Sequence, residues 1–107
     1  MPYNEKLDER IGGIVKGRAT SRKKMFGGTC HLLNGNMMCG VYRDFLILRL
    51  GETEAEKALA KPHVKPFDIT GRPMKGWVMV EEAGFRGKAL EEWLGKARRF
   101  AESLPGK

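Results

Sequence analysis

The sequence predicts an α+β fold, in which helices cover a central antiparallel sheet and the elements follow the order α-β-β-β-α-β-β-α. Two pairs of turn residues, Asn34-Gly35 and Arg43-Asp44, divide the apolar run from Met25 to Leu50 into three short strands. An amphipathic stripe from Leu90 to Leu104 indicates a helix. A length of 107 residues fits one domain that spans residues 1–107.

The first predicted element is a helix that begins at Asn4 and runs to about Lys16. The side-chain oxygen of Asn4 can accept a hydrogen bond from the first turn, and acidic residues on the early turns suit the helix dipole. Gly17 is a plausible end. The apolar face of this helix consists of Leu7, Ile11, Ile14 and Val15.

A concentration of positive charge follows, which consists of Lys16, Arg18, Arg22, Lys23 and Lys24. One interpretation is a patch that contacts nucleic acid phosphates or another acidic partner, which the net charge of +7 permits. The other is a solvated connection between the first helix and an edge of the sheet. No aromatic residue interrupts the charges, so a platform for base stacking is not indicated.

The central sheet follows from the two turns. Asn and Gly tolerate the positive φ angles of a type I′ turn, and directly paired residues share a face of the sheet. The expected pairs are Leu33–Asn36, Leu32–Met37, His31–Met38, Cys30–Cys39, Val41–Leu46, Cys39–Leu48 and Met37–Leu50. One face is then apolar and carries Cys30, Leu32, Met37, Cys39, Val41, Leu46, Leu48 and Leu50. The other is mixed and carries Thr29, His31, Met38, Gly40, Tyr42, Ile47 and Arg49.

The second half of the chain predicts a helix, two strands and a last helix. An acidic helix is expected over Glu52–Ala60, a strand over Phe67–Thr70, a turn over Gly71–Lys75 and a strand over Gly76–Val80. The inward residues of the acidic helix are Ala55, Ala58 and Leu59. The stripe of the last helix consists of Leu90, Trp93, Leu94, Ala97, Ala101 and Leu104, with Phe100 at its margin.

Cys30 and Cys39 are the most specific chemical feature of the sequence. The predicted register puts them in a non-hydrogen-bonded pair, where Cα atoms lie about 4.5 Å apart. That distance is at the close limit for a disulfide, so a strained redox pair is one interpretation. The other is two reduced thiols that act as small core residues, as is usual in a reducing cytoplasm.

No catalytic residue, metal ligand set or cofactor site is predicted, and the chain is not expected to be an enzyme. The cysteines lack CxxC spacing. Cys30 and His31 are neighbours on a strand, so their side chains point to opposite faces. His63 is expected at the surface of a loop. The chain lacks a bilayer-length apolar run and the features of a signal peptide, so a cytoplasmic protein without membrane association is expected.

Four segments, taken together in their order along the chain, resemble the TfoX/Sxy N-terminal domain family. They are Lys24–Gly28 (KMFGG), Leu33–Met37 (LNGNM), Asp68–Gly76 (DITGRPMKG) and Glu92–Pro105, with EWL at its start and FAESLP at its end. The resemblance implies an α+β domain similar to secretion-chaperone-like folds, with no catalytic residues. It also implies a link to natural competence, in which full-length members act with a cyclic-AMP receptor protein and carry a second domain. The 107 residues end after the first module, so a stand-alone domain is expected.

Three functional hypotheses follow. The first is a regulatory or adaptor module that contacts a protein partner through the mixed sheet face, at Tyr42 and Ile47. The second is direct nucleic-acid binding through the basic residues 16–24. The third is a thiol switch at Cys30 and Cys39. A homodimer formed through an edge strand is also compatible with the sequence.

Overall fold

The computed structural model describes residues 4–15, 20–25, 28–68 and 74–105. Its helices are α1 (Glu5–Val15), α2 (Glu52–Leu59) and α3 (Ala89–Glu102), with a single 3-10 turn, η1 (Glu82–Gly84). Its strands are β1 (Thr20–Met25), β2 (Gly28–Leu33), β3 (Asn36–Tyr42), β4 (Phe45–Arg49), β5 (Val64–Pro66) and β6 (Trp77–Val80). They form one sheet in the order β1-β2-β3-β4-β6-β5, in which all neighbours are antiparallel.

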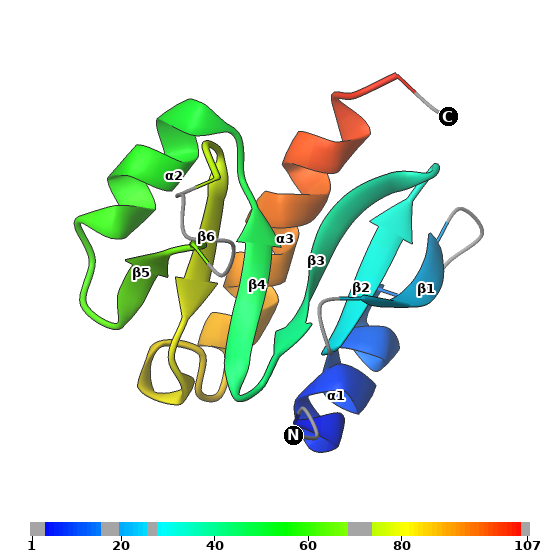
Figure 1. The fold of residues 1–107 in the computed structure, drawn as a ribbon, viewed down its shortest axis with the longest axis horizontal. Coiled ribbons are helices and arrows are strands. Elements are labelled where there is room, and N and C mark those ends of the chain that lie inside the picture. Colours follow the sequence, from blue (N-terminus) through cyan, green and yellow to red (C-terminus); the bar gives the residue numbers. More distant parts are fainter. Residues whose placement is uncertain (1–3, 16–19, 26–27, 69–73, 106–107) are drawn as a thin grey trace.

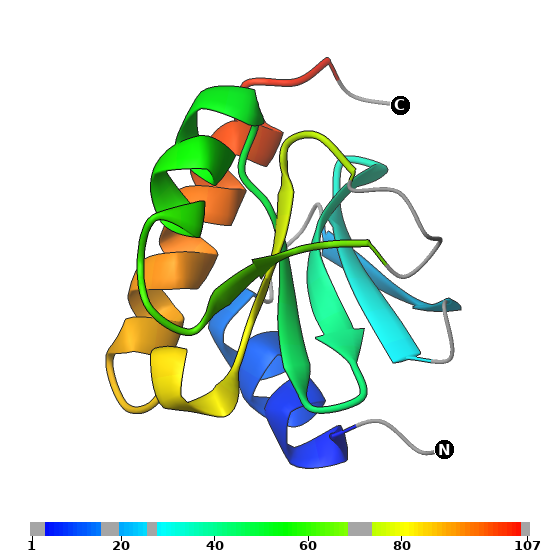
Figure 2. The same ribbon diagram turned by 60° about the vertical axis from the view of Figure 1, so that its left-hand side comes forward.

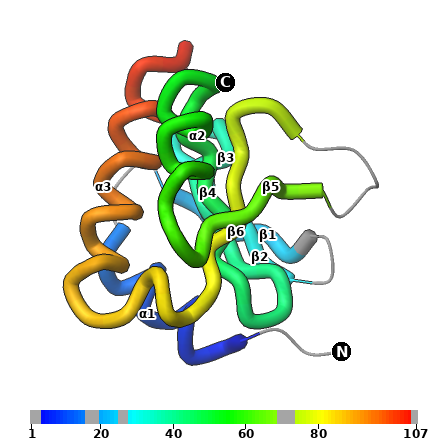
Figure 3. The backbone as a smooth tube through the Cα atoms, turned by 90° about the vertical axis from the view of Figure 1, so that its left-hand side faces the viewer, coloured from blue at the N-terminus to red at the C-terminus, as the bar shows by residue number. Residues whose placement is uncertain are grey.

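The helices gather on one face of the sheet (Figure 1, Figure 2). α3 packs against β3 and β4, and α1 packs beside it against β3. α2 lies at the other end of the sheet, against β5 and β6, as the view along the sheet in Figure 3 also shows. The α+β class and the central antiparallel sheet are therefore confirmed.

Several local predictions are confirmed as well. The Leu7 N–H donates to Oδ1 of Asn4 over 3.0 Å, so Asn4 caps α1 as expected. Asn34 (φ 52°) and Gly35 (φ 82°) both have the positive φ of a type I′ turn. In the register of β3 with β4, Val41 lies opposite Leu46 and Cys39 opposite Leu48 as predicted, whereas the predicted pair of Met37 with Leu50 is not part of the described ladder. The stripe of α3 is buried at Leu90, Trp93, Leu94, Ala97 and Ala101.

The element order needs two corrections. The segment predicted as a solvated connection contains an edge strand, β1, which pairs along its whole length with β2. Its charged sequence has no strand pattern, but backbone pairing with β2 is enough to hold a strand at the edge of a sheet. The strand expected over 67–70 is wrong: β5 ends at Pro66, Phe67 and Asp68 follow it without strand structure, and residues 69 and 70 lie outside the described residues.

The predicted pairing of β2 with β3 is wrong beyond the turn. Leu33 and Leu32 pair with Asn36 and Met37 as predicted, but His31 then pairs with Cys39, so Met38 is an extra residue without a partner across the ladder. Such a bulge moves every residue beyond it to the other face of the sheet. Thr29 and His31 therefore lie on the face that the helices cover, and Cys30 lies on the opposite face.

Two glycines let β2 and β3 approach closely beside this bulge. A Cβ on Gly40 would lie 2.2 Å from the carbonyl oxygen of Thr29, and one on Gly28 would lie 1.9 Å from that of Val41. Both distances are far shorter than any van der Waals contact. The local sheet geometry therefore requires glycine at both positions.

The face away from the helices has a small core of its own. Ile47, Phe67, Trp77 and Met79 are buried there, and the rings of Phe67 and Trp77 lie 5.7 Å apart. Ile47 is consequently not available to a partner, and the predicted contact surface at Tyr42 and Ile47 is wrong. Phe67 directly follows Pro66 and lies on this side of the sheet. Its carbonyl accepts a hydrogen bond from the N–H of Met74.

Two predicted core residues are exposed instead. Ile14 of α1 and Leu59 of α2 each keep 39% of their surface accessible. Each lies near the end of its helix, while Ala55 and Ala58 carry the contact of α2 with the sheet. None of the helices in the described residues is both long and apolar enough to cross a membrane.

Candidate functional site

Three of the five basic residues of the predicted patch lie in β1, and Lys16 and Arg18 lie outside the described residues. Arg22 is opposite His31, and Lys24 is opposite Thr29, on the face that α1 covers. Lys23 is opposite Cys30 on the other face. The side chains of Arg22, Lys23 and Lys24 therefore do not form one row of charge along the strand.

Arg22 belongs to a buried polar cluster around Asp8 of α1. Both Nε and Nη2 of Arg22 lie 2.8 Å from Oδ2 of Asp8. The hydroxyl of Thr29 donates to Oδ1 over 2.7 Å, and Nε2 of His31 lies 2.7 Å from the same oxygen. An ionised carboxylate only accepts hydrogen bonds, so Nε2 of His31 carries the proton in this contact.

The electrostatics of the cluster keep Asp8 charged. Burial raises the pKa of Asp8, but the hydrogen bonds from Arg22, Thr29 and His31 outweigh burial and hold this pKa below the ordinary value of 3.8. A charged aspartate inside the fold is thus compensated by three side chains from β1 and β2. The cluster ties α1 to the edge of the sheet.

Sequence reasoning missed this cluster because it assigned Asp8 to the helix dipole. A signal was present, since Asp8 lies three residues before Ile11 and seven before Val15, which is the spacing of the buried face. A carboxylate at such a position needs a partner, and Arg22 and His31 were candidates. The bulge at Met38, which no local pattern reveals, decides that His31 reaches it.

Cys30 and Cys39 do not face each other. Both are free and buried, and they pair with Gly40 and His31 respectively, so their side chains lie on opposite faces of the sheet. Burial raises the pKa of the Cys30 thiol to about 11, and burial raises the pKa of Cys39 as well. Thiols of this kind are protonated at neutral pH and react slowly, which is typical of core residues.

His63 is exposed, as predicted. It has a left-handed backbone (φ 67°), and its Nδ1 lies 3.4 Å from Oε2 of Glu81. The stronger partner of Glu81 is Lys65, at 2.8 Å. Within the described ranges, no group of three or more His, Cys, Asp or Glu side chains is placed to hold a metal ion.

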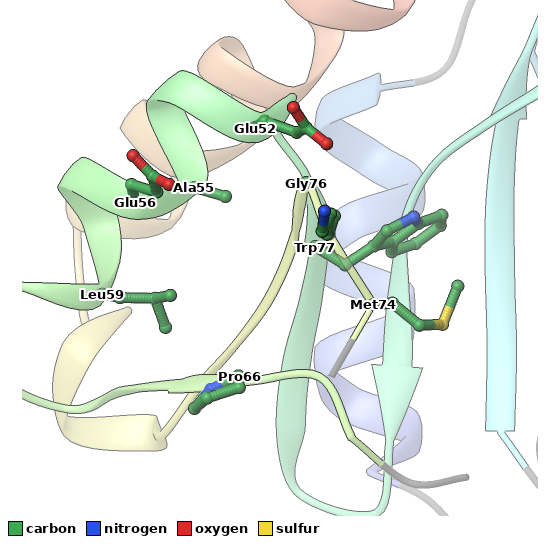
Figure 4. Close-up of a pocket in the computed structure, with 9 residues that line it drawn as sticks. Glu52, Ala55, Glu56, Leu59, Pro66, Met74, Gly76 and Trp77 are labelled. Carbon is green, nitrogen blue, oxygen red and sulfur yellow. The ribbon is translucent and has the colours of Figure 1, made fainter. Parts of the chain in front are cut away.

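A groove with a cavity volume of about 250 Å³ lies between α2 and the entry to β6 (Figure 4). Its lining consists of Glu52, Ala55, Glu56, Leu59, Pro66, Met74, Lys75, Gly76 and Trp77. In Figure 4, Ala55 and Leu59 extend from α2 toward the strands, where Pro66 and Trp77 lie. We call this surface the α2 groove.

One wall of the α2 groove is acidic. Glu52 and Glu56 are four residues apart, and residues at this spacing lie on the same side of a helix. Glu54 pairs with Lys57 over 3.4 Å. Neither Glu52 nor Glu56 has an ion-pair partner among the residues that the structure describes.

The groove continues around the start of α2 into a second hollow of about 340 Å³. Arg49 lies there, with its guanidinium 5.8 Å from the Trp77 ring centroid and 5.6 Å from that of Phe100. Gly51 turns the chain into α2 with a positive φ of 86°, and a Cβ at this position would lie 2.7 Å from the Phe100 ring. Gly51, directly before α2, is therefore in close contact with the Phe100 ring of α3.

The comparisons with known proteins agree with this architecture. The model of one protein family, described as the TfoX N-terminal domain, matches residues 16–101, a range that includes all six strands and all of α2. No curated protein and no solved structure matches the chain. The chain belongs to the TfoX N-terminal domain family and is a competence-regulator-like module.

Proposed function

We propose that this domain is a non-enzymatic cytoplasmic regulatory or adaptor module, and that it acts by binding another protein in the α2 groove. The single observation that carries the proposal is the exposure of Leu59 on the wall of a preformed cavity, beside two carboxylates that form no ion pair with any described residue. Membership of a family of regulators supports a role in regulation.

The surroundings of Leu59 distinguish it from an ordinary exposed leucine. Single apolar residues at a surface are common and need no explanation. Leu59, however, lines the α2 groove together with Ala55 and Pro66, so its exposed surface is part of an apolar hollow. A partner side chain that entered this hollow would bury apolar area on both molecules, which favours association.

Ile14 provides the comparison within the same molecule. It is also 39% exposed, and it lines a separate surface hollow together with Arg10, Lys88 and Glu91. Leu59 and Ile14 are thus matched in exposure and both lie in helices, but only Leu59 lies in the α2 groove. Ile14 is therefore the natural control for experiments on Leu59.

The experiment is photo-crosslinking in cells with benzoylphenylalanine in place of Leu59 or, as the control, Ile14. We expect the Leu59 position to yield a crosslink to one specific protein that the Ile14 position does not yield. The purified partner should then bind the wild-type protein and lose affinity for Leu59→Asp, while Ile14→Asp retains it. Equal products from both positions, or a crosslink only to a second copy of this chain, would overturn the proposal.

A further inference from the structure

We infer that the α2 groove recognises a protein segment in which one apolar side chain is flanked by lysine or arginine. This inference rests on the proposed function, because it names the class of partner for the same groove. It follows from three properties of the groove: its volume, the charge of its helical wall and the position of its one lysine.

The part of the groove beside Leu59 is small. Its volume is about 250 Å³, and the adjoining hollow of about 340 Å³ lies around the start of α2, beside Arg49 and Phe100. The groove is open on one side, and its apolar surface is formed mainly by Leu59 and Ala55 facing Pro66. Such a surface suits a single apolar side chain that projects from a segment lying along the groove, as in other helix and groove contacts between proteins.

The charge of α2 determines what should flank that side chain. The chain as a whole has a net charge of +7, yet Glu52, Glu54 and Glu56 make this helix locally acidic. Glu54 is already paired with Lys57, whereas Glu52 and Glu56 are left to interact with a ligand. Two carboxylates on one wall attract cations on the partner and repel acidic segments, which gives selectivity as well as affinity.

Lys75 adds a positive charge to the lining of the groove. It lies next to Gly76, on the segment that leads into β6. The cations of the bound segment should therefore lie against Glu52 and Glu56, and an acidic or carbonyl oxygen of the segment should face Lys75. A uniformly acidic segment could pair with Lys75 but would be repelled by Glu52 and Glu56.

The test uses a titration of the uniformly ¹⁵N-labelled protein with synthetic peptides, followed by NMR. The probe is acetylated and amidated GSKKLKKSG, and the comparison peptides are GSEELEESG, which reverses the charge, and GSKKAKKSG, which removes the apolar side chain. The backbone amide of Leu59 and the indole N–H of Trp93 separate specific from general effects. Leu59 lines the groove, while Trp93 Nε1 donates to the carbonyl of Gly84, elsewhere in the fold.

We expect the leucine-containing basic peptide to shift the backbone amide signals of Leu59 and Gly76, which line the groove, and to leave the indole signal of Trp93 nearly unchanged. The doubly neutralised variant Glu52→Gln/Glu56→Gln keeps the shape of the groove, and its affinity should fall roughly 3- to 30-fold, as for the loss of two exposed ion pairs. The charge-matched control Glu91→Gln/Glu92→Gln, on the exposed side of α3, should bind like the wild-type protein.

The outcomes separate this inference from the proposed function. Equal shifts with the acidic peptide, or an unchanged affinity in Glu52→Gln/Glu56→Gln, would overturn the preference for a basic segment. Either result would leave the groove as a docking site. Absence of shifts at the groove with any peptide would overturn the inference, and the crosslink at position 59 would then decide the proposed function by itself. Shifts of equal size at Leu59 and Trp93 would show non-specific binding and would also overturn the inference.

Discussion

Both Nε and Nη2 of Arg22 lie 2.8 Å from Oδ2 of Asp8, so Arg22 of the edge strand β1 forms an ion pair with a buried carboxylate of α1. The positive charge of Arg22, which the sequence analysis placed in a binding patch, is therefore compensated within the fold. The other carboxylate oxygen contacts Thr29 and His31, which makes Asp8 the centre of the contact between α1 and the sheet.

Removing Asp8 should destabilise the domain. Asp8→Ala is expected to lower the free energy of unfolding by about 3–5 kcal/mol, because the buried partners lose their acceptor. Arg22→Ala should cost only about 1 kcal/mol, since the Arg22 side chain is 44% exposed. Urea denaturation followed by fluorescence measures both. Glu9→Ala, on the exposed side of the same helix, is the control, and an equal loss in Glu9→Ala and Asp8→Ala would contradict the prediction.

The same cluster predicts a dependence of stability on pH. The pKa of Asp8 is lower in the folded protein than its ordinary value of 3.8, so the unfolded chain binds a proton at a higher pH than the folded one does. The stabilisation is then fully present above about pH 4 to 5 and is lost as the pH falls through the folded pKa. Urea midpoints measured between pH 6 and pH 2 should fall more steeply for the wild type than for Asp8→Asn. Parallel curves would argue against a role for Asp8.

The cysteines should be unreactive in the native state. A rise in the pKa of Cys30 from 9.0 to about 11 lowers its thiolate fraction at pH 8 about 100-fold, and burial restricts access further. Labelling with Ellman's reagent should therefore be slow until urea unfolds the protein, when both thiols should react. Mass spectrometry after mild oxidation should show no intramolecular disulfide. A bond between Cys30 and Cys39 would restore the thiol-switch hypothesis.

Gly40 should be essential for the pairing of β2 with β3. In Gly40→Ala the new methyl group would meet the carbonyl oxygen of Thr29 at 2.2 Å, and backbone atoms cannot give way without opening the β2–β3 pairing. We expect a loss of about 3 kcal/mol or more, the upper end of over-packing costs. Gly95→Ala in α3, where a Cβ meets nothing within 4 Å, should instead gain up to about 1 kcal/mol from helix propensity. Thermal unfolding of the two variants provides the comparison.

Nucleic-acid binding should be weak and non-specific. Lys23 and Lys24 lie on opposite faces of β1, and Arg22 is paired with Asp8. Anisotropy of labelled duplex DNA should show dissociation constants no tighter than ~10⁻⁶ M at physiological salt, as for general attraction to phosphates. Tighter binding that Lys23→Glu/Lys24→Glu abolishes would support the nucleic-acid hypothesis instead.

The local patterns of the sequence were sufficient for the fold class. Turn chemistry at Asn34-Gly35 and Arg43-Asp44 acts over neighbouring residues, so the turns and the register of β3 with β4 were predictable. The same holds for the cap at Asn4 and the stripe of α3, because capping and amphipathic spacing are properties of a single helix.

Tertiary structure decided the remainder, because each of these features depends on a contact between distant segments. The bulge at Met38 turns His31 toward Asp8 and separates Cys30 from Cys39, and no local pattern contains it. β1 is a strand because β2 pairs with it, not because of its own composition. The α2 groove exists because α2 and the entry to β6 meet, so the exposure of Leu59 and the position of Glu52 and Glu56 on one wall became visible only in three dimensions.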